Sequence, residues 1–304
     1  MPVSPLALED AGILAPLYNR LVADVPFCYP VSEDDYAAGV VLRGPDQNAH
    51  APRQEQQLLV NRRDDEILAF ADTVLERRDD ADRGIIRFFG YTPGERTAGQ
   101  ELLESAEARL RDAGAREVVA FSHDYGYPFY HFAFGYLSDR LAHILGLLGV
   151  NGYTVAPEGP DYRAQEIFFD WPDYDVPRPD SPDEKFSVHV LPRAGHGRLP
   201  NARIYLRHEG ERVGLCDTGC VGDWIRAEEA QETFFVRWLG IDEKWQNRGC
   251  GRYLLLSSLY ELRGLGYRRS TISTNLTNYR AMTFYASIGY KVVDTAYALT
   301  KPLE

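Results

Sequence analysis

A proline-rich segment divides the chain. Between Trp171 and Lys185 the sequence contains four prolines and five acidic residues. Proline has no backbone N–H and restricts φ, so such a run forms neither a helix nor an internal strand and stays extended. We therefore expect one domain over residues 1–170, a proline-rich linker over residues 171–185 and a second domain over residues 186–304.

The two parts repeat one order of predicted elements: a hairpin, a strand, a loop, a helix, a strand, a helix and a closing strand. In each copy the last helix ends at a glycine followed by a tyrosine, Gly152-Tyr153 and Gly289-Tyr290. In the first copy the spacing of apolar residues predicts helices from residue 8, after Ser32, and at 100–113 and 138–148, and strands at 3–6, 57–61, 67–75, 85–89, 118–121 and 167–169. In the second copy it predicts helices at 252–263 and 279–288, and strands at 186–191, 204–207, 213–216, 233–241, 270–274 and 291–298. A repeat of this length indicates two copies of one domain rather than a solenoid.

Composition excludes several functional classes. The formal net charge of -12 and the absence of a concentrated basic run argue against nucleic acid as a partner. The four cysteines lack the spacing of a zinc site, so no metal is expected. The N-terminus does not resemble a signal peptide, and no apolar run approaches the roughly 20 residues of a membrane helix. We therefore expect no membrane association and a cytoplasmic location.

The loop from Gln246 to Gly251 joins a predicted strand to a predicted helix. Its sequence, Gln-Asn-Arg-Gly-Cys-Gly, places two glycines directly before the helix. Glycines let backbone N–H groups approach a ligand closely, and a helix N-terminus carries about half a positive charge. The loop is therefore a candidate phosphate-binding site, although a tight strand-to-helix turn has the same pattern.

A second motif lies on the next helix. Asn278 stands at its N-terminal edge, and Ala281 and Tyr285 follow at a spacing of four, so they share one face. A small residue at 281 permits close approach of a ligand, and a phenol at 285 can point the same way, although a packed amphipathic aromatic residue has the same pattern.

Together, residues 234 to 290 resemble the core of the GNAT acetyltransferase superfamily. Its acyl-CoA loop, Arg/Gln-x-x-Gly-x-Gly/Ala, is matched by Gln246, Gly249 and Gly251, and its later Asn-x-x-Ala-x-x-x-Tyr motif by Asn278, Ala281 and Tyr285. The resemblance implies an α+β fold of two tandem GNAT-type domains, each a mixed, mostly antiparallel sheet flanked by helices.

The resemblance also implies roles. Acetyl-CoA would be the co-substrate, and Tyr285 would protonate its departing thiolate, since a phenol of pKa near 10 is a suitable donor to a thiolate of pKa about 8.5. The pantetheine arm would lie along a splayed strand end, and main-chain N–H groups of the loop would hold the pyrophosphate. The residues expected at the cofactor are Leu239, Gly240, Ile241, Gln246, Asn247, Arg248, Gly249, Cys250, Gly251, Arg252, Asn278 and Ala281.

A general base is less clearly marked. Family members often use a carboxylate that acts through water, and Glu232, just before the strand, is our candidate. Asp217, Asp223 and Glu228 are the alternatives, and no spacing selects among them. Only residues 192–201 separate the first predicted strand of this copy from its hairpin, so the two helices usual for the family do not fit there.

The first copy has lost key residues. When the helices are aligned through Gly114 and Gly266, Gly99 matches Gly251 but Thr97 replaces Gly249. An alternative register keeps Arg96 and Gly99 but places Glu101 at the last glycine. Counting back from the Gly-Tyr pair places Leu148 at the position of Tyr285, and Leu141 at that of Asn278. The first copy is therefore expected to be catalytically silent.

We predict an acyl-CoA-dependent N-acetyltransferase that moves an acetyl group from acetyl-CoA to the amine of a small molecule. The protein is expected to act as a monomer or homodimer. The alternative is a non-catalytic protein that binds or senses acyl-CoA.

Overall fold

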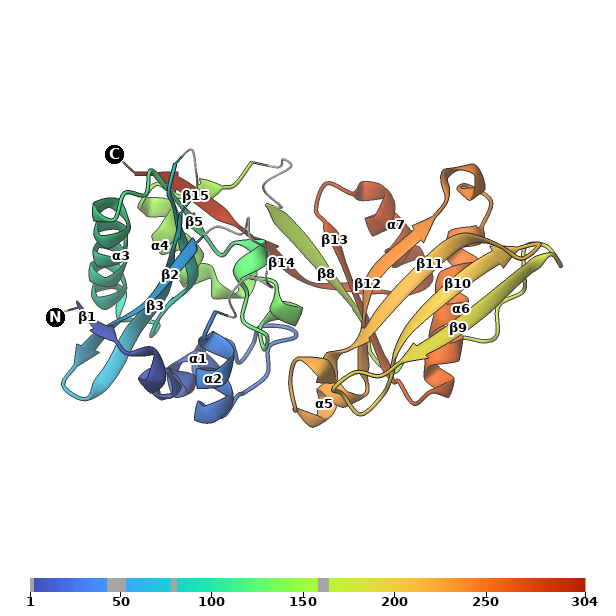
Figure 1. Cartoon of the computed structure of the whole chain (residues 1–304), viewed down its shortest axis with the longest axis horizontal. Coiled ribbons are helices and arrows are strands. Elements are labelled where there is room, and N and C mark those ends of the chain that lie inside the picture. Colours follow the sequence, from blue (N-terminus) through green and yellow to red (C-terminus); the bar gives the residue numbers. More distant parts are fainter. Residues whose placement is uncertain (1–2, 43–52, 78–80, 158–163, 304) are drawn as a thin grey trace. The chain divides into compact units, whose positions relative to one another are not determined.

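The computed structural model describes residues 3–42, 53–77, 81–157 and 164–303. The chain forms two compact units (Figure 1). Unit 1 contains Met1–Glu166 together with the C-terminal segment Asp294–Glu304, and unit 2 contains Ile167–Val293.

Unit 1 is built on a seven-stranded sheet of order β1-β2-β3-β4-β5-β15-β7, in which β4 and β5 run parallel. Gly90 of β4 faces Leu21 of α1, whereas the next residue, Tyr91, faces Gly99 of α3. Because side chains alternate along a strand, α1 and α3 cover opposite faces of the sheet. The elements are β1 (Val3–Leu6), α1 (Ala15–Leu21), α2 (Glu33–Val40), β2 (Arg53–Arg63), β3 (Glu66–Arg77), β4 (Arg83–Tyr91), α3 (Arg96–Asp112), β5 (Glu117–Ala120), α4 (Ala142–Val150), β7 (Thr154–Val155) and β15 (Leu299–Pro302).

The second sheet has eight strands in the order β6-β14-β8-β13-β12-β11-β10-β9. Of these, β9 to β13 belong wholly to unit 2, and β12 and β13 form its parallel pair. The elements are β6 (Leu137–Ser138), β8 (Gln165–Trp171), β9 (Phe186–Arg193), β10 (Asn201–His208), β11 (Glu211–Cys220), α5 (Glu228–Gln231), β12 (Thr233–Ile241), α6 (Cys250–Gly264), β13 (Arg269–Asn275), α7 (Tyr279–Ile288) and β14 (Lys291–Tyr297). As expected from the short connection, no helix lies between β9 and β10.

The closing strands are exchanged between the two halves of the sequence. The strand predicted at 167–169 was assigned to the first copy, but β8 lies in the second sheet between β13 and β14. The strand predicted at 291–298 is β14. A further strand that the sequence did not predict, β15, begins at Leu299 and pairs with β5 of unit 1 through Leu299 and Ala120. Each unit is therefore completed by a strand that the sequence order assigns to the other copy.

The proline-rich segment is extended but packs on unit 2. Tyr174 and Val176 belong to the buried core of that unit, and the Tyr174 ring lies 5.9 Å from that of Phe234. The compact units therefore divide at residues 166 and 294 rather than at residues 171–185. The physical reason is that apolar side chains of the segment complete a core, which a free linker does not do.

A β-bulge recurs at the parallel pair of each unit. In β12 the register with β11 shifts so that Arg237 is the extra residue, and in β4 the same shift against β3 makes Arg87 the extra residue. Pairing of β12 with β13 then ends at Val236, although β12 continues to Ile241. A bulge bends and twists its strand, so the two parallel strands separate at this point.

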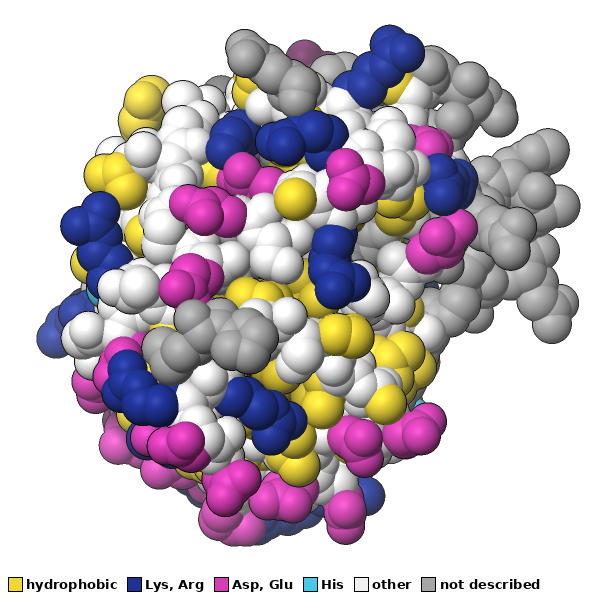
Figure 2. All heavy atoms as spheres, turned by 90° about the vertical axis from the view of Figure 1, so that its left-hand side faces the viewer, with side chains coloured by type: hydrophobic (Ala, Val, Ile, Leu, Met, Phe, Trp, Pro, Cys, Tyr) yellow, Lys and Arg dark blue, Asp and Glu magenta, His cyan; other side chains and the backbone are white. Residues whose placement is uncertain are grey.

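Charged side chains of both signs lie on the face shown in Figure 2, with acidic side chains more frequent along its lower edge. Within the residues that the structure describes, no helix is both long and apolar enough to cross a membrane. The same residues contain no group of three or more His, Cys, Asp or Glu side chains suited to a metal ion.

Candidate functional site

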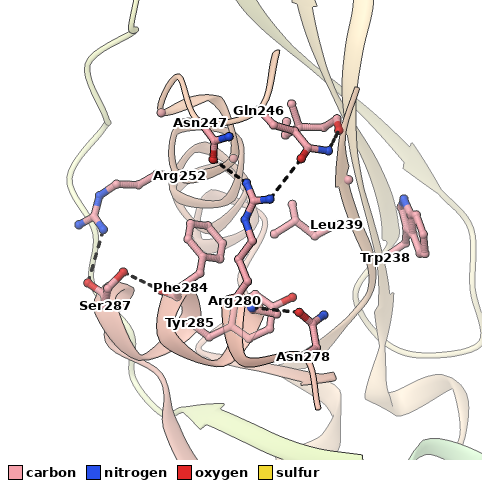
Figure 3. Close-up of a pocket in the computed structure, with 15 residues that line it drawn as sticks. Trp238, Leu239, Gln246, Asn247, Arg252, Asn278, Arg280, Phe284, Tyr285 and Ser287 are labelled. Carbon is pink, nitrogen blue, oxygen red and sulfur yellow. Dashed lines mark hydrogen bonds between the residues drawn. The ribbon is translucent and has the colours of Figure 1, made fainter. Parts of the chain in front are cut away.

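A pocket of about 760 Å³ opens in unit 2 between the separated end of β12 and the helices α6 and α7 (Figure 3). Eleven of the fourteen residues predicted from the sequence line it, although they come from three segments. Those eleven are Leu239, Gly240, Ile241, Gln246, Asn247, Gly249, Gly251, Arg252, Asn278, Ala281 and Tyr285, and the pocket also includes Trp238, Arg280, Phe284 and Ser287.

The wall formed by β12 offers backbone groups without a strand partner on one side. The ladder with β13 ends at the pair Val236 and Ile272, so the edge of β12 from residue 237 to residue 241 is not paired with β13. Backbone N–H and C=O groups require partners when they are buried. This edge is therefore suited to an extended ligand with amide groups, which would lie beside it like an additional strand.

The loop before α6 has the geometry of an anion site. Gly249 is the N-cap of α6 at φ +80°, and no heavy atom lies within 4 Å of the position that a Cβ would occupy. Asn247, two residues earlier, also has a positive φ of 61°. The Gln246 side-chain amide donates to the Ile241 carbonyl at 3.0 Å. The first backbone N–H groups of α6 are thereby left open to a ligand, as at other helix N-termini that bind phosphate.

Arg280 is a pocket residue that the sequence motifs missed. Its guanidinium donates to the Asn247 side chain at 2.8 Å and approaches Gln246 at 3.4 Å, so it spans from α7 to the loop (Figure 3). Arg252 of α6 reaches the Ser287 carbonyl at 3.4 Å. Both cations border the open helix N-terminus, where they add positive charge. The only sequence signal for Arg280 was its place in the first turn of α7.

Asn278 organises the start of α7. Its Oδ1 accepts from the Ala281 N–H at 3.2 Å, and its Nδ2 donates to Thr274 Oγ1 at 3.0 Å. These are the contacts of an N-cap, for which asparagine is among the preferred residues. Asn278 thus fixes the direction in which the helix carries Ala281 and Tyr285 past the pocket.

Tyr285 lines the pocket and is 8% exposed. Its ring packs edge-on against Phe169 of β8, with 5.5 Å between ring centroids, and against Tyr290 at 6.2 Å. The exchanged strand β8 therefore helps to hold the predicted acid in place.

Two loop residues face away from the pocket. Arg248 stacks over the Trp245 ring at 5.4 Å, and Cys250 is buried in the core of unit 2. Main-chain groups of both residues were expected at the cofactor. The Arg248 side chain was also expected to add charge-assisted hydrogen bonds to the phosphate, but it packs on Trp245 instead.

The structure does not bring Glu232 to the pocket. It lies at the start of β12, about 20 Å along the strand from Leu239 at roughly 3.3 Å per residue. Its carbonyl instead accepts from the Arg268 and Arg269 N–H groups. A general base must lie within hydrogen-bond reach of the proton, directly or through one water, so we give Glu232 no role.

The alternative carboxylates have structural partners. Asp223 accepts from the backbone N–H groups of His196 and Gly197 at 2.6 and 2.8 Å and so fixes the connection from β9 to β10. Glu228 pairs with Arg198, and this pair lowers the pKa of Glu228. Asp217 is surrounded by three arginines on the opposite face of the sheet from α6.

The corresponding groove of unit 1 is filled. Tyr91 ends β4 as Ile241 ends β12, and a Cβ at Gly99 of α3 would lie 2.7 Å from the Tyr91 ring. The Tyr91 hydroxyl also donates to the His143 carbonyl of α4 at 2.8 Å. The ring therefore occupies the space between α3 and α4.

The loop before α3 also differs from its counterpart. It contains four residues, 92–95, where unit 2 has eight, 242–249, and its N-cap is Glu95, which pairs with Arg63 at 2.6 Å. Leu141 is the N-cap of α4, as Asn278 is of α7.

Comparisons with known proteins agree with this geometry. Residues 200–292 match the family model described as "Acetyltransferase (GNAT) domain". No curated protein sequence matches the chain. Among solved structures, a tandem GNAT protein from the clavulanic acid biosynthesis pathway is similar over 99% of this chain and 98% of its own, with a TM-score of 0.64 and 13% identity.

Two further structures are similar in fold. A GCN5-related N-acetyltransferase from Sphaerobacter thermophilus has a TM-score of 0.61 and 18% identity, over 99% of this chain and 95% of its own. A glucosamine N-acetyltransferase region of a fungal multi-domain β-N-acetylglucosaminidase has a TM-score of 0.62 and 15% identity over 98% of this chain, which spans 38% of that longer protein. Residues 200–292 therefore form a GNAT acetyltransferase domain, and the chain as a whole has a fold similar to that of a tandem GNAT protein.

Proposed function

We propose that unit 2 is an N-acetyltransferase that moves an acetyl group from acetyl-CoA to the amine of a small molecule by direct attack. The observation that carries the proposal is one pocket that combines an unpaired strand edge, an open helix N-terminus and a buried phenol. A thioester with an amide-bearing arm and a pyrophosphate requires these three features together.

The residues present fit the co-substrate. The edge of β12 at Leu239 to Ile241 would hold the pantetheine amides, and the N–H groups at the start of α6 would hold the pyrophosphate. Arg280 and Arg252 would add charge-assisted hydrogen bonds to phosphate oxygens. Gly251 leaves room beside them, since a Cβ there would make only ordinary contacts, 3.8 Å from Ile241 and 3.9 Å from Phe284.

Acetyl-CoA would supply an activated acyl group. The acceptor nitrogen forms a bond to the carbonyl carbon while the carbon–sulfur bond breaks, and the amine loses one proton as the thiolate gains one. Backbone N–H groups of the unpaired part of β12 would polarise the carbonyl. Tyr285 would donate the proton to the thiolate, because its phenol is the acidic side chain in the pocket and Phe169 fixes its ring.

Unit 1 would not turn over. The Tyr91 ring fills its groove, a carboxylate stands at the N-cap of α3, and Leu148 lies on α4 where α7 carries Tyr285. Its part in the protein would be structural.

The test combines binding with turnover. Calorimetry with acetyl-CoA and release of free CoA across an amine panel would be measured for the wild type, Tyr285→Phe and Tyr260→Phe, the last being an exposed control tyrosine on α6. We expect Tyr285→Phe to bind acetyl-CoA normally and to lose kcat by about 10²-fold or more, the usual contribution of a general acid. Tight binding without amine-dependent turnover in the wild type would instead support a non-catalytic acyl-CoA-binding protein.

A further inference from the structure

Three arginines surround one carboxylate on the sheet face of unit 2 that lies opposite α6 and α7. Asp217 of β11 is 2.5 Å from Arg193, 3.1 Å from Arg203 and 3.3 Å from Arg237. Three positive charges against one negative charge leave a formal excess of two positive charges. The arginine side chains stay 32%, 44% and 35% exposed, so a ligand can reach them. We call these four residues the arginine cluster.

The cluster adjoins the point where β12 and β13 separate. Arg237 is the bulge residue, and it follows directly after Val236, the last residue of β12 that pairs with β13. Across the sheet, Arg203, Asp217 and Trp238 are successive cross-strand partners, so their side chains share one face. Trp238 also borders the pocket, and it lies on the side of β12 away from α7 (Figure 3). A molecule on the cluster would therefore lie beside the separated strands, on the face that the cofactor leaves free.

The fold makes room for this arrangement. A Cβ at Gly219 would lie 3.1 Å from the Arg237 Cζ, so the guanidinium lies flat over a position that has no side chain. Arg237 also donates to the Thr218 carbonyl at 2.9 Å, which orients it. Among the described residues, Arg193 Nε is a buried donor without an acceptor. Each arginine has five N–H donors, and one carboxylate with about four acceptor sites does not satisfy three arginines.

We propose that the acceptor amine carries an anionic group, a carboxylate or a phosphate, which the arginine cluster binds. This inference rests on the proposed acetyltransferase activity and adds a substrate class to it. Arginine forks bind planar carboxylates and phosphates through paired, charge-assisted hydrogen bonds. With the anion held by Arg203 and Arg237, the amine of a short acceptor points to the separation of the strands.

The test uses matched acceptors that differ in the anionic group. β-Alanine is compared with propylamine, and O-phosphoethanolamine with ethanolamine, by CoA release at fixed acetyl-CoA. The proteins are the wild type, Arg203→Gln, Arg203→Lys, Arg237→Gln, and the control Arg212→Gln, an exposed arginine on the same strand as Asp217. Acetyl-CoA affinity and the unfolding temperature are measured for each to verify the fold.

We expect kcat/KM of the wild type to favour one or both anionic acceptors over their neutral partners by about tenfold or more, the value of one charge-assisted bond. Arg203→Gln and Arg237→Gln remove this preference through KM. Arg203→Gln leaves turnover of the neutral amines and acetyl-CoA affinity unchanged, Arg203→Lys restores part of the preference, and Arg212→Gln behaves as wild type. The pair that shows the preference distinguishes a carboxylate from a phosphate. Equal use of neutral and anionic amines, or a preference that survives both glutamine variants, overturns the inference while the acetyltransferase activity stands. Turnover of no amine at all overturns both.

Discussion

Phe169→Ala offers a direct test of the strand exchange. Phe169 falls in the first predicted domain, residues 1–170, yet in the structure it is 1% exposed within the core of unit 2 and packs against Tyr285. If β8 completes the second sheet, the substitution destabilises unit 2 and not unit 1.

The magnitude follows from burial. Replacing a fully buried phenylalanine by alanine costs about 3–5 kcal/mol, because apolar contacts are lost and a cavity remains. Since about 1.4 kcal/mol is a factor of ten in an equilibrium constant, the population of opened unit 2 rises on the order of 10²- to 10³-fold. Amides that exchange only through that opening gain the same factor in rate.

Hydrogen exchange followed by mass spectrometry is the suitable assay, because it locates the loss. Peptides from β11 to α7 should exchange faster in Phe169→Ala, whereas peptides from β2 to β5 should not change. Leu299→Ala is the reciprocal control: Leu299 comes from the C-terminal end of the sequence, is 2% exposed and pairs with Ala120. It should accelerate exchange in unit 1 and leave unit 2 intact.

The reasoning is refuted if Phe169→Ala accelerates exchange in β3 to β5 while peptides of unit 2 keep wild-type rates. That pattern would mean that β8 closes the first sheet, in the order in which the sequence presents it. Equal acceleration everywhere in both variants would show that the two units unfold as one, and would contradict their separate cores.

Two further predictions concern the loop and a buried thiol. Gly249→Glu should abolish acetyl-CoA binding in calorimetry, since Gly249 has φ +80° and a carboxylate there faces the anion site; Gly264→Glu, at the far end of α6, is the control, and unchanged affinity of Gly249→Glu would remove the loop from the cofactor site. Burial raises the pKa of Cys216 to about 12 from an ordinary value near 9. Between these values the folded state keeps a thiol proton that the unfolded state loses, so the free energy of unfolding declines as the pH rises from 9 toward 12. Between pH 8 and pH 10 the free energy of unfolding of the wild type, measured by urea titration, should fall about 1.4 kcal/mol more than that of Cys216→Ala. If the two proteins lose stability equally over this range, the pKa of Cys216 is not raised in the folded state.

Local features of the site were predictable because short-range physics determines them. The N-cap of α6 has a left-handed backbone conformation, which favours Gly249. Asn278 caps the N-terminus of α7, and Gly289 follows α7 at φ +134°. Each of these residues satisfies a backbone requirement within four positions of itself. The order of elements in the two copies followed from the same kind of signal.

The exchanged strands were not predictable, because pairing between distant strands leaves little local trace. Ile167 and Phe169 present an apolar face that either sheet can bury, and the break at Ala298 lies in a run that alternates like one strand. Arg280 was missed for a related reason: only the folded loop brings Asn247 within hydrogen-bond reach of it. Glu232 was chosen by its place before a strand, and the length of that strand carries it away from the pocket.

Each unit has an aspartate–arginine pair at its β-bulge, and the two pairs differ in burial. Asp72 and Arg87 in unit 1 occupy the positions of Asp217 and Arg237 in unit 2, because each arginine is the bulge residue and each aspartate is the last β3 or β11 residue before the shift. The pair in unit 1 is 2.8 Å apart and buried, with the Tyr127 hydroxyl bonded to the same carboxylate at 3.0 Å. Burial still raises the pKa of Asp72 despite the guanidinium. An ion pair enclosed by aromatic rings stabilises a fold but meets no ligand. The pair in unit 2 is partly exposed and is joined by two more arginines, so it presents charge to solvent. Both units thus have an aspartate–arginine pair at the bulge. Aromatic side chains bury this pair in unit 1, whereas in unit 2 it remains accessible and is proposed to bind an anionic acceptor.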